Sequence, residues 1–112
     1  MDQRELYRLQ AEFCQTLADP TRLEILQLLR DGPRPVKELV EATGQRQAKV
    51  SQHMAVLRQR GIVRADRLGV EIHYSITDDR ILEACRITRD LLVERLRRQG
   101  ELADRFAAVV GE

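Results

Sequence analysis

The sequence predicts a mainly α-helical protein with one small β-hairpin. Two short helical patterns flank a tight turn at Gly44, between residues 36 and 60, and a hairpin pattern follows directly at residues 62–76. Aromatic residues make up only 4% of the chain and Trp is absent, so the core has to be built from aliphatic side chains. A chain of 112 residues is expected to fold as one domain, residues 1–112.

The first two helices are predicted ahead of the turn at Gly44. Residues 4–17 predict an amphipathic helix, whose apolar stripe is made by Leu6, Leu9, Phe13 and Leu17. The second helix is expected to begin at Asp19 and Pro20, because a capping carboxylate followed by proline is a typical helix start. It is apolar on more than one side and is expected to stop at Asp31-Gly32, so we expect it to be the core helix.

Residues 36–60 predict a helix, a turn and a second helix. Gly44 lies where a left-handed cap would end the first of these helices. In the second helix an apolar stripe is made by Val50, Met54 and Leu57. At about 100° per residue, the residues that point away from this stripe are Ala48, Lys49, Gln52 and Gln59, with Ser51, His53 and Arg58 on the flanks. None is acidic, and such side chains are able to pair with base edges in the major groove of DNA. The alternative is the ordinary solvated face of a surface helix.

The hairpin pattern predicts two strands, at residues 62–67 and 71–76, joined by a turn at Gly69. In the second strand polar residues alternate with the apolar Ile72, Tyr74 and Ile76. His73 is one of these polar residues and is expected to be exposed. A hairpin placed just after a DNA-reading helix is able to reach the backbone or the minor groove beside it.

A last helix is predicted over residues 79–110, too long for so small a domain to cover. One side of it carries Ile81, Cys85, Thr88, Leu92 and Leu96, and the pattern resumes after Gly100 with Leu102, Phe106 and Val109. We therefore expect this side to pack against another subunit.

Three blocks of sequence, in this order and at this spacing, resemble the ArsR/SmtB family of winged helix-turn-helix repressors. They are LADPTRLEIL at residues 17–26, KVSQHMAVLRQRGIV at 49–63 and GVEIHYSI at 69–76, and the resemblance covers nearly the whole chain. It implies a helix-turn-helix at 36–60 and a wing at 62–76. It also implies a homodimer formed by the first and last helices, 4–17 and 79–110. Family members repress an operator and are released from it by a metal or another effector.

Two positions depart from the pattern of the resembled family. Arg46 stands where the family often has a capping Ser, and Val70 stands where the wing tip often carries a cation. The first departure weakens the expected helix cap, and the second weakens the expected wing contact.

The expected partner is a double-stranded DNA operator. A dimer would read two half-sites about one DNA turn apart, so the operator should be an imperfect palindrome. The formal net charge of +1 does not bear on this, because the placement of the cations decides binding. The expected operator contacts are Gln45, Arg46, Gln47, Lys49, Ser51, Gln52 and His53, with Arg64 and Arg67 from the wing. Arg22 is expected to make either a phosphate contact or a surface ion pair.

Neither metal site common in the resembled family is retained, so no metal at those sites and no cofactor are expected. The segment VKELVEATG at residues 36–44 contains no Cys or His, and residues 78–96 contain no His. A zinc ion would need about four such ligands. A soft metal ion held by Cys14 and Cys85 across the dimer stays open as an unusual site.

The two cysteines, Cys14 and Cys85, lie on the helices that are expected to pack together, and in a chain without export signals their thiols are expected to be reduced. Some members of the resembled family sense persulfides or oxidants through a cysteine pair, and we take this over as the first hypothesis for the effector. In those members one cysteine lies in the second helix, where this chain has Gln27, so the match is by residue type only. The alternative is that both cysteines are small buried hydrophobic residues.

An enzyme is not expected. Ser51 and His53 are the only neighbouring nucleophile and base, and on a helix they point about 200° apart. The sequence has no phosphate-binding glycine loop, no membrane-spanning apolar run and no secretory N-terminus, so we expect a cytoplasmic protein that does not enter a membrane. A constitutive DNA-binding protein and a protein-interaction module are the competing functions.

Overall fold

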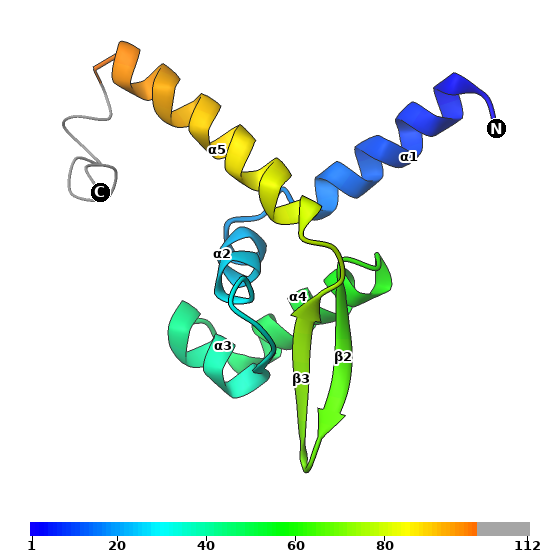
Figure 1. Ribbon diagram of the computed structural model, residues 1–112, viewed down its shortest axis with the longest axis vertical. Helices are drawn as coiled ribbons and strands as arrows, with labels where there is room; N and C mark the ends of the chain where they lie inside the picture. The colour runs from blue at the N-terminus through cyan, green and yellow to red at the C-terminus, as the bar shows by residue number, and fades with distance from the viewer. Residues whose placement is uncertain (101–112) are drawn as a thin grey trace. The chain divides into compact units, whose positions relative to one another are not determined.

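The computed structural model describes residues 1–100 and confirms a mainly helical protein with a small antiparallel sheet (Figure 1). Its elements are α1 (Gln3–Thr16), α2 (Pro20–Leu28), β1 (Arg34–Pro35), α3 (Val36–Thr43), α4 (Gln47–Gln59), β2 (Val63–Leu68), β3 (Glu71–Ile76) and α5 (Arg80–Arg98). Residues 1–79 form one compact unit, and the segment that begins at Arg80 forms a second. The predicted continuation of the last helix beyond Gly100 lies outside the described residues.

The core of the first unit is aliphatic, as the composition predicts. It is formed by α2, α3, α4 and the start of β2, through Ile25, Leu26, Leu29, Leu39, Val50, Met54, Leu57, Ile62 and Val63. The stripe predicted for α4 is therefore its buried face.

The predicted start of α2 is confirmed, but its predicted end is wrong. The carboxylate of Asp19 accepts a hydrogen bond from the Arg22 amide at 3.0 Å, and Pro20 is the first helical residue. The helix ends at Leu28 instead of Asp31-Gly32, because the chain already turns there to enter β1. The Arg34 guanidinium donates to the Leu28 carbonyl at 2.7 Å and supplies a partner that the helix no longer provides.

The end of α4 sets the direction of the hairpin. Gly61 has φ of 75°, the amide of Ile62 donates to the Leu57 carbonyl, and the amide of Gly61 donates to the Arg58 carbonyl. This is a Schellman motif, in which glycine takes the left-handed position at no steric cost. Ile62 and Leu57 are both buried, so the chain leaves the helix directly into the core and then into β2. Gly44 ends α3 in the left-handed conformation, as predicted.

The sheet has three strands in the order β1-β3-β2, whereas the sequence predicted a two-stranded hairpin. Arg34 pairs with Tyr74 and Pro35 with His73, so β3 is the central strand. Proline is tolerated because β1 is an edge strand. This central position also corrects the prediction for His73, which is half-buried. Ile72 lies on the opposite face of β3 from His73. It is 46% exposed, so the apolar residues of β3 do not all face the core.

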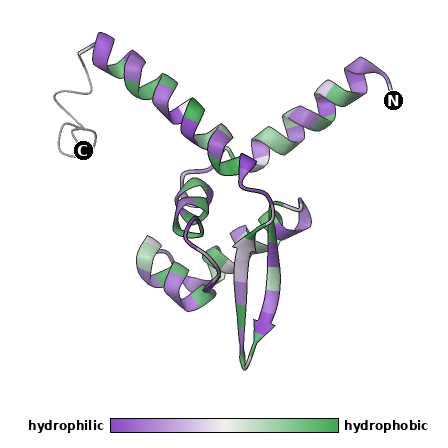
Figure 2. Cartoon of the chain, viewed as in Figure 1, coloured by the Kyte–Doolittle hydropathy of each residue, from purple (hydrophilic) through white to green (hydrophobic). Residues whose placement is uncertain are grey.

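Both α1 and α5 carry large apolar residues that are exposed, and Figure 2 shows hydrophobic residues recurring between hydrophilic ones along each helix. On α1 the large exposed apolar residues are Leu6, Tyr7, Leu9 and Phe13, and on α5 they are Ile87, Leu91 and Leu92. No residue of α5 is buried. Such faces are unfavourable in water and are typical of surfaces that pair with another chain.

Candidate nucleic-acid interface

The outer face of α4 is exposed and free of acidic residues. Exposed side chains here include four residues of the predicted contact set, Gln47, Lys49, Ser51 and Gln52, and α4 contains no Asp or Glu. The preceding turn adds Arg46, which is exposed, and Gln45, which is half-buried. Gln45 and Arg46 precede the helix and the other four lie in its first two turns, so all six are gathered at one end of α4.

The cations of this face are not neutralised by the protein. Within the described residues, Arg46, Lys49, Arg58 and Arg60 make no ion pair. Arg58 and Arg60 are not among the predicted contacts, although both are exposed. Their exposed charges would have been visible from the helical spacing, since both lie outside the Val50 stripe.

The first turn of α4 also lacks a side-chain cap, as the Arg46 departure suggests. Arg46 is the N-cap residue and its side chain accepts nothing from the helix. The positive end of the helix is therefore open, and this is the end at which proteins commonly bind phosphate oxygens.

The wing is a hairpin whose two-residue turn, Gly69 and Val70, projects from the sheet (Figure 1). Arg64 and Arg67 are both exposed. Arg64 is paired with Asp66 at 3.2 Å, whereas Arg67 has no ion pair in the described part of the chain. Glu71 is bound by Lys37 of α3 at 3.1 Å, which raises the pKa of Lys37 through that hydrogen bond and ties the wing to the helix-turn-helix. Arg67 is thus the wing cation free to meet a phosphate.

His53 does not belong to this exposed face, and the prediction that it contacts the operator is corrected. Its side chain is buried, with only 9% of the residue exposed, and burial lowers its pKa. The Arg22 guanidinium donates to His53 Nδ1 at 3.0 Å, so Arg22 also makes an internal contact in place of the expected phosphate contact or surface ion pair. The spacing could have shown this, because His53 lies three residues after Val50 and four before Leu57, on the buried side of the helix.

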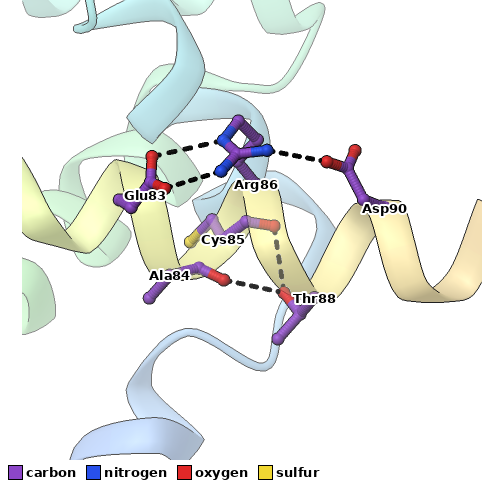
Figure 3. A network of polar contacts seen from close by, with 6 residues as sticks. All are labelled: Glu83, Ala84, Cys85, Arg86, Thr88 and Asp90. Atoms are coloured by element: carbon purple, nitrogen blue, oxygen red, sulfur yellow. Dashed lines mark hydrogen bonds and ion pairs between the residues drawn. The ribbon is translucent and has the colours of Figure 1, made fainter.

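The two cysteines differ in their surroundings. Cys14 on α1 is exposed and Cys85 on α5 is half-buried, and burial raises the pKa of the Cys85 thiol. Figure 3 shows Cys85 beside an ion-pair network in which Arg86 binds Glu83 at 2.6 Å and Asp90 at 2.8 Å. The Thr88 hydroxyl donates to the carbonyl of Cys85 at 3.0 Å (Figure 3). None of these contacts involves the sulfur atom.

Two other kinds of site are not found in the described part of the chain. Residues 1–100 contain no group of three or more Cys, His, Asp or Glu side chains placed to hold a metal ion. None of the helices over the same residues has the length and apolar character that crossing a membrane requires.

A helix-turn-helix with an exposed, acid-free second helix, followed by a projecting hairpin, defines a winged helix-turn-helix DNA-binding transcriptional regulator. Residues 19–65 match the model of the bacterial regulatory proteins of the arsR family. The chain is 40% identical over 97 residues to the transcriptional regulator Rv0081 of Mycobacterium tuberculosis, covering 86% of this chain and 85% of that one. It belongs to the ArsR family of DNA-binding transcriptional regulators, which are not enzymes.

Solved structures agree with this assignment. The crystal structure of Rv0081 matches with a TM-score of 0.77 over 84% of this chain and 95% of that one. The homodimeric winged helix-turn-helix DNA-binding domain of Mb0332 from Mycobacterium bovis, 28% identical, matches with a TM-score of 0.74 over 88% of this chain and 93% of that one. A probable mercury resistance operon repressor of Streptomyces lividans is 39% identical over 84 residues, 75% of this chain and 67% of that one.

Proposed function

We propose that the protein is a homodimeric repressor that binds an imperfectly palindromic operator with α4 and the wing. The observation that carries this proposal is the exposed face at the start of α4, where unpaired cations and amide side chains lie together without an acidic residue. Amides are suited to adenine and cations to guanine or phosphate. The proposed contacts are Gln45, Arg46, Gln47, Lys49, Ser51 and Gln52, with Arg64 and Arg67 from the wing.

The proposal of a homodimer rests on the apolar faces of α1 and α5. The similar Mb0332 domain is homodimeric, and these exposed faces would be covered if this chain paired in the same way. Repression is supported by the similarity to the operon repressor of S. lividans. A dimer that covers a promoter excludes RNA polymerase, and two α4 helices would read two half-sites.

Gln52→Ala tests base reading. We expect it to relax the base preference at one position of each half-site, because a bidentate amide contact is worth about 1–3 kcal/mol of discrimination. The matched control is Gln27→Ala, since Gln27 is an exposed glutamine on α2 away from this face. Selection of binding sites from random DNA with each variant is the measurement. Equal weakening on all sequences would mean that Gln52 reads no base.

Lys49→Ala tests phosphate contact. Removing one phosphate contact should lower affinity and reduce the slope of log affinity against log salt by about one unit per chain. Arg30→Ala, which removes the same charge at an exposed position outside α4, controls for a general change of charge. An unchanged slope would remove Lys49 from the interface.

The proposal extends to the effector, which would be a sulfur species or an oxidant acting on Cys14 and Cys85. The exposure of Cys14 makes it the thiol that reagents reach first, whereas the raised pKa of Cys85 slows its reaction as a thiolate. Two thiols that join in a disulfide lose two protons and two electrons, which hydrogen peroxide takes up as two water molecules.

Operator binding should therefore be measured with reduced protein, with peroxide- or polysulfide-treated protein, and in Cys14→Ser and Cys85→Ser variants. Thiol sensing predicts release on treatment only when both cysteines are present. Tight binding that ignores treatment would return both cysteines to a packing role. Mercuric ion added in parallel tests the second candidate, a soft-metal-responsive repressor, which the similarity to the S. lividans repressor favours. Binding that nothing releases would identify a constitutive DNA-binding protein.

A further inference from the structure

Arg22 connects three helices through its own side chain and backbone. Its Nη1 donates to the carbonyl of Thr16, the last residue of α1, at 3.0 Å, and its Nε donates to His53 Nδ1 on α4 at 3.0 Å. Its backbone amide binds the Asp19 carboxylate at the start of α2 at 3.0 Å. One guanidinium group therefore holds the end of α1 and the middle of α4 at fixed positions relative to α2.

The partner of Arg22 on α4 is a buried imidazole. Because Nδ1 accepts a hydrogen bond, neutral His53 carries its proton on Nε2. That nitrogen is buried, has no hydrogen-bond partner and lies 3.7 Å from the Asp19 carboxylate. His53 is also the only polar residue among the buried residues of α4, which are otherwise Val50, Met54 and Leu57.

We propose that Arg22 and His53 are positioning residues for operator binding, which clasp α4 against the end of α1 so that its outer face meets the bases in register. The proposal rests on the proposed use of α4 to read DNA. Apolar packing alone tolerates small rotations of a helix, whereas a directional bond between a guanidinium and an imidazole does not.

The location of the clasp explains why it would affect recognition. Lys49 lies one turn before His53 on the same helix, and Gln52 is its neighbour in sequence. The N-terminus of α4 has no side-chain cap, so the buried contacts that begin at Val50 are what hold this end. Because α1 carries one of the proposed dimer faces, the clasp also links that face to the recognition helix.

Two substitutions of equal shape separate positioning from packing. Leu and Asn branch alike at Cγ, but only the Asn amide oxygen is able to accept from Arg22. We expect His53→Leu to weaken binding to a duplex selected by the wild-type protein from random DNA by about tenfold or more, as for loss of a bond to a charged group. On a scrambled duplex it should lose less than about twofold, because non-specific binding is electrostatic. His53→Asn should stay within about threefold of wild type on both duplexes.

Substitution of Arg22, the donor of the hydrogen bond to His53, gives a second test. Lys keeps the charge of Arg22 but cannot bridge Thr16 and His53 together, so Arg22→Lys should resemble His53→Leu. Arg30→Lys is the matched control, because Arg30 is exposed and its guanidinium pairs with its sequence neighbour Asp31. Wild-type affinity in His53→Leu or Arg22→Lys would overturn the proposal. Equal loss on both duplexes, with a lower unfolding temperature, would overturn it too, because the pair would then serve folding alone.

A pH profile of binding to both duplexes gives a further readout, because a role in folding alone would change the two affinities equally. Protonated His53 has no free lone pair and faces Arg22 and Lys49 as like charges, although Asp19 favours the charged form. Operator affinity should therefore fall as the pH drops below the ordinary histidine range, since burial lowers the pKa of His53. Protonation of a DNA-facing histidine would instead raise affinity. His53→Asn should remove the fall, and His73→Asn should retain it.

Hydrogen exchange of the free protein separates failure of the clasp from failure of the proposed function. Amides of α4 should exchange faster in His53→Leu than in His53→Asn if the bond holds the helix. If the wild type selects no DNA sequence, the proposed function fails, and the positioning role fails with it even if exchange confirms the bond. If DNA is selected but exchange and affinity are unchanged by His53→Leu, the clasp alone fails.

Discussion

Val70 occupies the tip of the wing and is 93% exposed, so the most prominent side chain of the wing is aliphatic. The neighbouring cation Arg64 is already paired with Asp66, which leaves Arg67 to attract phosphates. The wing is therefore expected to contribute little to the affinity for DNA phosphates. In the proposed function, a cation at its tip would add one phosphate contact.

Val70→Arg should consequently strengthen operator binding and steepen its salt dependence by about one unit per chain, the effect of one added phosphate contact. The measurement is affinity over a range of salt concentrations. Val70→Ser controls for the loss of the aliphatic side chain and should leave the slope unchanged. An unchanged slope in Val70→Arg would show that the wing tip stays away from the DNA backbone.

At the scale of single elements, the N-terminus of α4 has fewer stabilising hydrogen bonds than its C-terminus. Arg46 provides no side-chain cap, whereas the Schellman motif at Gly61 satisfies the last carbonyls. Arg46 is also a proposed DNA contact, so in the proposed function this position would serve binding at a cost in helix stability.

Arg46→Ser should separate the two roles. A serine hydroxyl at this position is able to accept from the first-turn amides and should stabilise the folded protein by about 1 kcal/mol, measured by urea unfolding. Operator affinity should fall at the same time, because a cation is lost. Arg58→Ser removes a cation in the last turn of the same helix, where a serine hydroxyl has no first-turn amide to accept from, and should not raise stability. A rise in both stability and affinity would exclude Arg46 from the interface.

Elements with strong local signals could be predicted from the sequence. Asp19 and Pro20 fixed the start of α2, Gly44 the end of α3, and Gly69 the turn of the wing, because each acts through its own backbone or nearest neighbours. The strand β1 could not be predicted, since two residues show no alternation and their pairing depends on β3. The role of His53 was missed because its partner, Arg22, lies 31 residues away in the chain.

At the scale of the whole molecule, His53 and Asp19 are among the groups of the described residues that couple folding to pH. The pKa of His53 is lowered from 6.5 by burial, and the pKa of Asp19 is lowered from 3.8 chiefly by the Arg22 amide. As the pH falls below about 6.5, the unfolded chain binds a proton at position 53 before the folded chain does, so the free energy of unfolding decreases. Asp19 adds a second loss as the pH falls below about 3.8, because its bound carboxylate favours the folded state only while ionised.

Unfolding in urea between pH 7.5 and 5 should therefore show stability falling with acid, and His53→Asn should flatten this part of the profile. His73→Asn should keep the wild-type slope. If His53→Asn left the slope of unfolding free energy against pH unchanged, the loss of stability in acid would not come from His53.

In the proposed function, two copies of this chain read two related half-sites with α4. The most direct measurement is selection from random duplex DNA with the purified protein, followed by sequencing and by determination of the mass of the complex. We expect an imperfect palindrome with half-sites about 10 base pairs apart, centre to centre, bound by one dimer. Selection of no common sequence, or of a single half-site bound by one chain, would contradict it.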